Sequence, residues 1–252
     1  MRRIVIALAL AGALAPGAAL SGQSLAQRAA AIRDGRLRFS FAARPGVCSS
    51  GNGITLMDHE DDGEWEGRST PGPIMVSLEV RKGRVAGAET HVGGRWRRTA
   101  PGTTDLGALP ARQAAADLLA LAEASRSDDT EELITAATLA ASAVVWPDLL
   151  RLARRTDLPE DTRRHAIFWL GQAAGAAAMR GLDSLANDRD GNLEIRKQAV
   201  FALSQRPAEE GVPALIHIAR TSPQGEVRKS ALFWLGQSDD PRALALFEEL
   251  LR

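Results

Sequence analysis

The chain has 252 residues, of which 45% are hydrophobic and 25% charged, a composition typical of folded globular proteins and unlike that of disordered chains. Its 31 basic and 31 acidic residues balance, and residues 106–252 hold more acidic than basic side chains, which argues against a surface that follows nucleic-acid phosphates. The one cysteine, Cys48, excludes an intramolecular disulfide and a multi-cysteine metal site.

Residues 1–26 have the pattern of a secretory signal peptide. Two arginines precede an apolar stretch over residues 4–15, and small residues suited to cleavage end at Ser21 and again at Ala26. Cleavage after either residue fits the pattern. The alternative is an uncleaved anchor, but the stretch is shorter than the roughly 20 residues of a membrane span. We therefore predict a periplasmic or secreted protein with no stable membrane insertion after cleavage.

Residues 27–105 predict a small antiparallel β-rich domain with a linker at its end. Hydrophobic and polar residues alternate over residues 36–41 and again over 74–81, as in strands with one buried face. Lys82-Gly83 suits a hairpin turn into residues 84–92. The turn-forming residues 100–104 indicate the linker to the next region.

Residues 106–252 predict a helical region. Apolar residues at helical spacing indicate one helix after Pro110 and a second one that includes Leu133, which Asp128 or Asp129 would cap. This second helix lies about one repeat before the first copy of a phrase that recurs downstream. It is therefore predicted to belong to an atypical first repeat, as expected at the end of a stack.

A ten-residue phrase occurs three times in the second half of the chain. It reads RRHAIFWLGQ from Arg163, RKQAVFALSQ from Arg196 and RKSALFWLGQ from Arg228. In the middle copy, apolar residues that include Ala199 and Leu203 fall on one helical face. A period of 32 to 33 residues indicates stacked units that bury their apolar faces against one another.

A second motif repeats with the same period and predicts the partner helix of each pair. Its copies start at Pro147, Arg180 and Pro213, and a last copy spans residues 241–251. Proline is tolerated in the first helical turn because that position has no hydrogen bond to lose. Pro147 and Pro213 are accordingly expected at or near that turn.

These helix pairs resemble HEAT repeats over residues 128–252, and the run from Val227 to Gly236 resembles the second-helix motif of that family. The resemblance implies a right-handed α-solenoid that acts as a binding scaffold and has no catalytic activity. The predicted fold class is therefore α+β, in which a small antiparallel β-rich domain precedes a HEAT-like solenoid.

One basic, one aromatic and one amide residue recur four residues apart on each repeated phrase, away from its core face. Side by side, these columns predict a partner-binding surface for a protein or peptide of unknown identity. An alternative is that the phenylalanines pack between repeats and the glutamines close the helix ends; Trp169 and Trp234 are predicted to pack. We call the nine residues the ladder: Arg164, Phe168, Gln172, Lys197, Phe201, Gln205, Lys229, Phe233 and Gln237.

The sequence predicts no catalytic residue, metal or cofactor. The common hydrolase, metalloprotease, phosphate-loop and Cys-x-x-Cys motifs are missing from it. The acidic run from Asp58 to Glu66 partly follows a calcium loop, but Ser69 stands where such a loop needs a bidentate glutamate. A solvated acidic loop is the preferred interpretation, and His165 and His217 are expected to have surface or packing roles.

The leading hypothesis is therefore an exported, non-enzymatic scaffold that binds a protein or peptide on the concave face of the solenoid and does not bind nucleic acid. An alternative is an enzyme or chromophore-handling protein, since HEAT-like repeats also occur in bilin lyases and in alkylated-base DNA glycosylases; this alternative depends on fold analogy. A second alternative is a calcium-dependent adhesion protein of the envelope.

Overall fold

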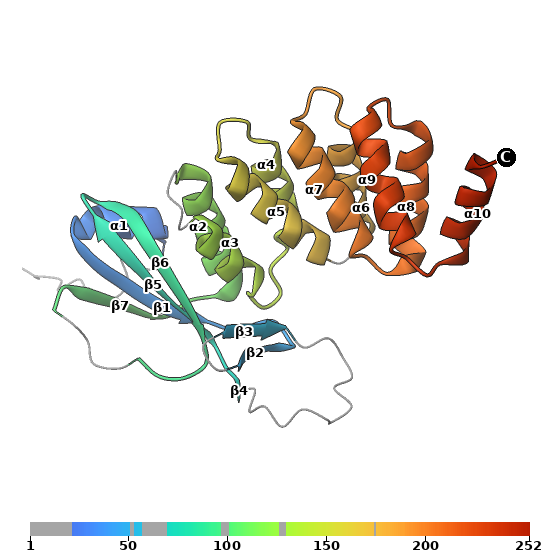
Figure 1. Cartoon of the computed structure of the whole chain (residues 1–252). Helices are drawn as coiled ribbons and strands as arrows, with labels where there is room; N and C mark the ends of the chain where they lie inside the picture. The colour runs from blue at the N-terminus through green and yellow to red at the C-terminus, as the bar shows by residue number, and fades with distance from the viewer. Residues whose placement is uncertain (1–21, 51–52, 57–69, 97–100, 126–129, 174) are drawn as a thin grey trace, which may run out of the picture.

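The computed structural model describes residues 22–50, 53–56, 70–96, 101–125, 130–173 and 175–252. Within them an N-terminal helix and two small sheets precede a row of paired helices (Figure 1). The strands are β1 (Gly35–Phe41), β2 (Val47–Ser50), β3 (Gly53–Leu56), β4 (Thr70–Pro71), β5 (Ile74–Arg81), β6 (Arg84–Val92) and β7 (Thr103–Ala108). The helices that flank the sheets are α1 (Leu25–Ile32), α2 (Ala111–Ala124) and α3 (Thr130–Thr138).

The larger sheet has the strand order β6-β5-β1-β7, and β3-β2-β4 form the smaller one. In β1, Leu37, Phe39 and Phe41 are buried and the residues between them are less so, as the alternation predicts. β1 pairs with β5 antiparallel but with β7 parallel. The sheet is therefore mixed, and the antiparallel prediction is wrong at β7 because the chain leaves β6 at one edge and returns at the opposite edge.

The structure also corrects the predicted linker and domain boundary. Thr103 and Thr104 belong to β7, where they lie opposite Arg36 and Leu37 of β1. The strand continues to Ala108 and so lies across the boundary that was predicted between residues 105 and 106. A strand at the edge of a sheet needs little apolar sequence, because it is half exposed.

The remaining helices follow in pairs, and each pair stacks on the one before it (Figure 1). The first helix of each pair is α4, α6 or α8, and its partner is α5, α7 or α9; α10 closes the row. Their bounds are α4 (Trp146–Arg154), α5 (Glu160–Gln172), α6 (Ala176–Ala186), α7 (Leu193–Ser204), α8 (Ala208–Thr221), α9 (Gly225–Gly236) and α10 (Pro241–Leu250). The α+β class and the helical repeat region are confirmed.

Local sequence explains several helix starts. Pro147 lies in the first turn of α4, as predicted, and Asn192 caps α7 by accepting hydrogen bonds from the amides of Glu194 and Ile195. Pro213 lies inside α8, near its first turn as predicted, but the helix begins before the motif copy that starts at Pro213. The helix starts earlier because Pro207 precedes a segment with acidic residues in its first turn, which favours helix initiation.

The β region packs directly on the start of the helical row. Ala43 forms an isolated β-bridge with Ala140, and the Arg44 amide donates to the Leu139 carbonyl at 2.8 Å. The Arg44 guanidinium lies 5.9 Å from the ring centroid of Trp169 on α5. Buried residues of the sheets and of the helices form one continuous hydrophobic core, so the two regions hold each other in place.

Candidate partner-binding surface

The helical row has two layers, and the ladder lies on the more tightly packed one. Helices α3, α5, α7 and α9 contact one another more closely than α4, α6 and α8 do. Gly171 supports this close approach, because a Cβ atom there would lie 3.1 Å from the Cβ of Ala202 on α7. A stack bends toward its more tightly spaced layer. The layer of second helices, which we call the inner layer, is therefore the concave one.

The core stripe of the repeated phrase lies where the helical period places it. Ile195, Ala199, Ala202 and Leu203 of α7 are all buried. Trp169 is buried on α5, and the larger part of Trp234 on α9 packs against the core. The predicted packing role of the two tryptophans agrees with these positions.

The ladder residues lie outside that stripe, at the protein surface. The side chains of Phe168 and Phe233 are 39% and 57% exposed, whereas Phe201 is half-buried. The three glutamines, at the ends of their helices, are exposed, and so are Arg164 and Lys229; Lys197 is half-exposed. The alternative that all three phenylalanines are buried between repeats therefore fails for the outer two.

Aromatic contacts differ along the ladder. Phe201 leans against Trp234 of the next repeat, with the ring centroids 5.0 Å apart, and this contact explains why it is half-buried. Phe168 and Phe233 instead meet the tryptophan of their own helix edge to face, at 5.4 and 5.0 Å. The middle phrase has Ala202 in place of a tryptophan, and this small residue faces Gly171 of α5.

Each basic ladder residue pairs with an acidic residue one helical turn earlier. The nitrogen-to-oxygen distances are 3.8 Å for Arg164–Asp161, 3.2 Å for Lys197–Glu194 and 2.8 Å for Lys229–Glu226. These pairs are exposed, so each contributes little to stability and can exchange partners with water or a ligand. The inner layer thus presents paired charges beside exposed rings, and it is not a uniformly cationic surface.

The comparison with known families matches residues 147–233 and 184–252 to HEAT repeats. The helical C-terminal region belongs to the HEAT-repeat family. The predicted family is therefore confirmed for residues 147–252, and the earlier pair α2/α3 stays a predicted atypical repeat. Comparison with curated proteins gave no significant match.

His165, on α5, lies beside the ladder and contacts a tryptophan and a threonine. His165 Nε2 lies 3.0 Å from Trp169 Nε1 and 2.9 Å from Thr135 Oγ1. Because the indole N–H can only donate, Nε2 accepts, and this bond requires the ring to lack a proton there. Burial lowers the pKa of His165 from its usual value, although Glu131, 3.7 Å from Nδ1, opposes the shift. His165 therefore has the packing role that was expected.

A shallow hollow of about 210 Å³ opens next to this histidine. It is lined by residues of α3, α5 and α7: Glu131, Asp161, Arg164, His165, Phe168 and Gln198. Two ladder residues of α5, Arg164 and Phe168, thus form part of the wall of the hollow. It can accept one side chain of a bound segment.

The arginine that opens each repeated phrase has a structural role that the sequence did not reveal. Arg196 is 1% exposed, and its Nε donates to the Ala186 carbonyl at 3.1 Å; Arg163 is equally placed against the Ala153 carbonyl at 3.0 Å. Burial lowers the pKa of Arg163. Each guanidinium holds the C-terminal end of the first HEAT helix, where carbonyls are unpaired and the helix dipole favours a cation.

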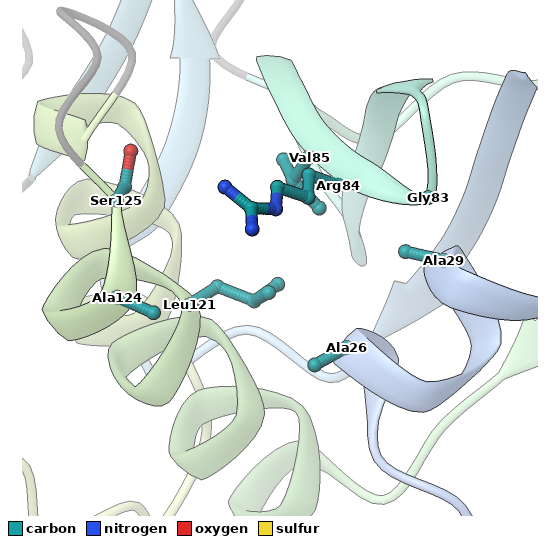
Figure 2. A pocket seen from close by; sticks show the side chains of 8 residues that line it. All are labelled: Ala26, Ala29, Gly83, Arg84, Val85, Leu121, Ala124 and Ser125. Atoms are coloured by element: carbon teal, nitrogen blue, oxygen red, sulfur yellow. The ribbon is translucent and has the colours of Figure 1, made fainter. Parts of the chain in front are cut away.

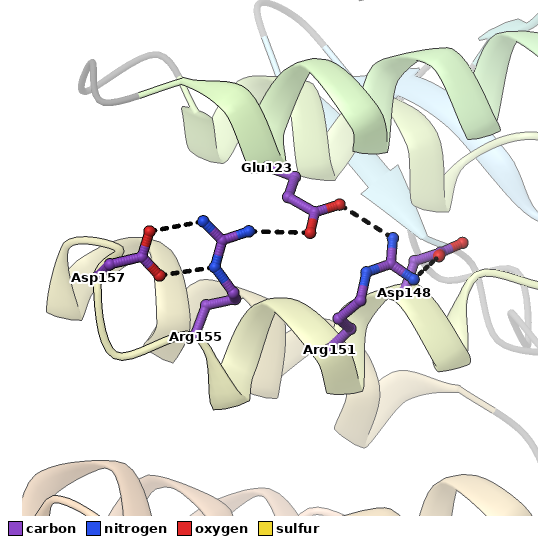
Figure 3. A network of polar contacts seen from close by, with 5 residues as sticks. All are labelled: Glu123, Asp148, Arg151, Arg155 and Asp157. Carbon is purple, nitrogen blue, oxygen red and sulfur yellow. Dashed lines mark hydrogen bonds and ion pairs between the residues drawn. The ribbon is translucent and has the colours of Figure 1, made fainter.

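The other layer is joined by ion pairs. Glu123 on α2 contacts Arg151 of α4 at 3.1 Å and Arg155, which follows α4, at 2.9 Å, and Asp148 and Asp157 complete the network (Figure 3). The Arg151 hydrogen bond is the largest cause that lowers the pKa of Glu123. Long arginine side chains therefore bridge these first helices, which pack less closely than those of the inner layer.

The larger cavities lie on the β side of the molecule. One of about 600 Å³ is lined mainly by small residues of α1, α2 and the β5–β6 hairpin, and Arg84 reaches into it (Figure 2). Another of about 870 Å³ lies between α1, β7 and the start of α2, with Gly22 and Asp117 on its wall. Both are far in sequence from the ladder, and α1 takes part in both.

Three further predictions concern calcium, membrane insertion and enzymatic activity. The acidic run Asp58–Glu66 lies outside the described residues, so the calcium hypothesis stays a prediction; the residues that the structure does describe contain no cluster that could hold a metal ion. Among those same residues, no helix has the length and apolar character needed to cross a membrane. The enzyme or chromophore-handling alternative also stays a prediction.

Proposed function

We propose that the protein is a non-enzymatic scaffold that holds a protein or peptide partner on the inner layer of its HEAT repeats. HEAT repeats suggest a role in protein interaction. The observation that carries the more specific proposal is the ladder, since the same basic, aromatic and amide residues reach the surface from three successive repeats. Phe233, 57% exposed, supports it most directly, because a large ring that stays in water gains by being covered.

The partner would gain three kinds of contact. Exposed phenylalanine rings would cover its apolar side chains, and the glutamine amides can donate to and accept from an extended backbone. A partner carboxylate would compete with Asp161, Glu194 or Glu226 for the ladder cations. This exchange costs little, because the existing ion pairs are exposed.

The β region would orient the partner at the ladder residues of α5, which are Arg164, Phe168 and Gln172. Its attachment through Ala43 and Arg44 brings it to α3 and to Trp169, next to the hollow under Phe168. A partner chain that follows the ladder from α9 toward α5 would therefore meet the β region at the end of its path.

We further propose that the scaffold acts outside the cytoplasm, in the periplasm or as a secreted protein. This part of the proposal depends on the signal-peptide pattern of residues 1–26. It can be tested separately from binding, by locating the protein after cell fractionation.

The binding proposal is tested by crosslinking capture from the native envelope fraction. The parent chain is compared with Lys197→Glu/Lys229→Glu, which reverses two ladder charges, and with Arg180→Glu/Arg189→Glu, which makes the same charge change at exposed positions away from the ladder. We expect the ladder variant to lose a partner that the control variant still captures. Equal capture by all three chains would show that the ladder is not the site.

A further inference from the structure

The two candidate cleavage points of the signal peptide differ in what they leave of helix α1. Ser24 caps this helix, and a capping box joins Ser24 and Gln27 through bonds of 3.3 and 2.9 Å. Cleavage after Ala26 would remove Ser24 together with the first two of the eight helical residues. Cleavage after Ser21 would leave the cap and the whole helix in place.

The residues that the later cleavage would remove also anchor α1 to the rest of the protein. Leu25 is fully buried in the common core, and its amide donates to Asp117 Oδ2 of α2 at 3.2 Å. Asp117 is itself largely buried. The hydrogen bonds that the structure describes for its carboxylate come from the Leu25 amide and from Gln113 Nε2, the latter at 2.9 Å. Losing Leu25 would empty a core position and leave a buried carboxylate less satisfied.

The position of the new N-terminus points the same way. Cleavage after Ala26 would place a charged amino group on Gln27, inside what is now the first helical turn, where the helix dipole disfavours positive charge. Cleavage after Ser21 would place it on Gly22, which is exposed and precedes the helix cap.

From these contacts we propose that the exported chain is cleaved between Ser21 and Gly22, and that α1 is a structural element of the mature protein. This inference rests on the proposed export. The protease would hydrolyse the Ser21–Gly22 peptide bond with one water molecule, and a small residue would occupy the position before the cut, as signal-peptide cleavage requires.

The test is to express the full chain and to determine the N-terminus of the exported product by intact mass and terminal sequencing. We expect it to start at Gly22. Ser21→Leu should abolish this processing, because a large residue replaces the small one, whereas Ala26→Leu should leave the N-terminus at Gly22. Ala26 is exposed, so the control substitution does not disturb the core.

The outcomes separate this inference from the proposed export. An exported product that starts at Gln27, or that keeps residues 1–21, would overturn the assigned cleavage and leave export standing. A chain that keeps residues 1–21 and stays in the cytoplasm would overturn export, and with it this inference.

Discussion

Two phenylalanines at equivalent positions of the repeated phrase should respond differently to the same substitution. Phe233→Ser should change the free energy of unfolding by less than about 1 kcal/mol, because the ring is mostly in water. Phe201→Ser should cost about 1–3 kcal/mol, since its ring packs against Trp234. Thermal and denaturant unfolding measure both effects, and capture should be lost in both variants.

The comparison is informative because stability and binding are read separately. If Phe233→Ser unfolded much earlier than the parent chain, its ring would be part of the core and its place in the ladder would be wrong. If it kept full stability and full capture, the ring would be exposed without taking part in binding.

His165 should make the fold less stable in mild acid. Its pKa is lowered in the folded state, so the unfolded chain takes up a proton first as the pH falls below about 6.5. The contribution of His165 is therefore fully present above that pH and is lost as the pH falls toward the lower folded-state pKa. When the pH is lowered from 7.5 to 5.5, the melting temperature of His165→Gln should therefore fall by less than that of the parent chain. His217→Gln, a change at an exposed histidine, is the control and should follow the parent.

At the scale of single helices, the buried arginines should matter more than the ladder cations beside them. Arg196→Met removes the donor to the Ala186 carbonyl at the end of α6 and should cost about 1.5–3 kcal/mol, the range for a hydrogen bond to a charged group. Lys197→Met changes the next residue, whose ion pair with Glu194 is exposed, and should cost less than about 0.5 kcal/mol. If chemical denaturation showed equal losses of unfolding free energy in the two variants, Arg196 would not stabilise the end of α6 as described.

The repeated helices could be predicted from sequence because their apolar spacing recurs, and recurrence separates a pattern from chance. The role of Arg163 and Arg196 could not, since an arginine at the start of a helix looks like a solvated charge until the preceding helix end is placed beside it. The parallel pairing of β7 was equally hidden, because strand direction depends on the path of the connecting chain and not on the alternation within Thr103–Ala108.

The ladder was predictable as a set of positions but not as a surface. Helical spacing separates Phe201 from the core stripe around Ala199 and Leu203. It does not say how close the neighbouring helix comes, and that distance decides how much of each ring is covered. Exposure of Phe168 and Phe233 therefore had to come from the packing of α5, α7 and α9.

For the molecule as a whole, we expect the β region and the HEAT repeats next to it to unfold together. They share one hydrophobic core and are joined through Ala43, Arg44 and Trp169. Tryptophan fluorescence and far-ultraviolet circular dichroism should then report one coincident transition. A separate early transition of the β-sheet signal would show that the two regions are independent.

The turn-forming residues 100–104 indicate a linker in the sequence, but in the structure the last two of them begin strand β7. Residues 103–108 are used as strand β7, and Leu109 donates its amide to the Ser40 carbonyl at 2.8 Å. Composition identifies residues that can form turns, but only the fold decides whether a neighbouring sheet edge takes them up.

Helix α5 contacts α7 in much the same way as α7 contacts α9. The length of the inner layer could therefore change by the addition or loss of whole repeat units. Among the described residues, the close contacts of each unit of 32 to 33 residues are with its neighbours. Duplicating α6 and α7 within the chain would therefore add one set of basic, aromatic and amide ladder residues and keep the existing kinds of interface. Because the β region covers the α3 end, such growth would move α10 farther from a fixed starting point. The distance between the β region and α10 is therefore set by the number of repeat units between them.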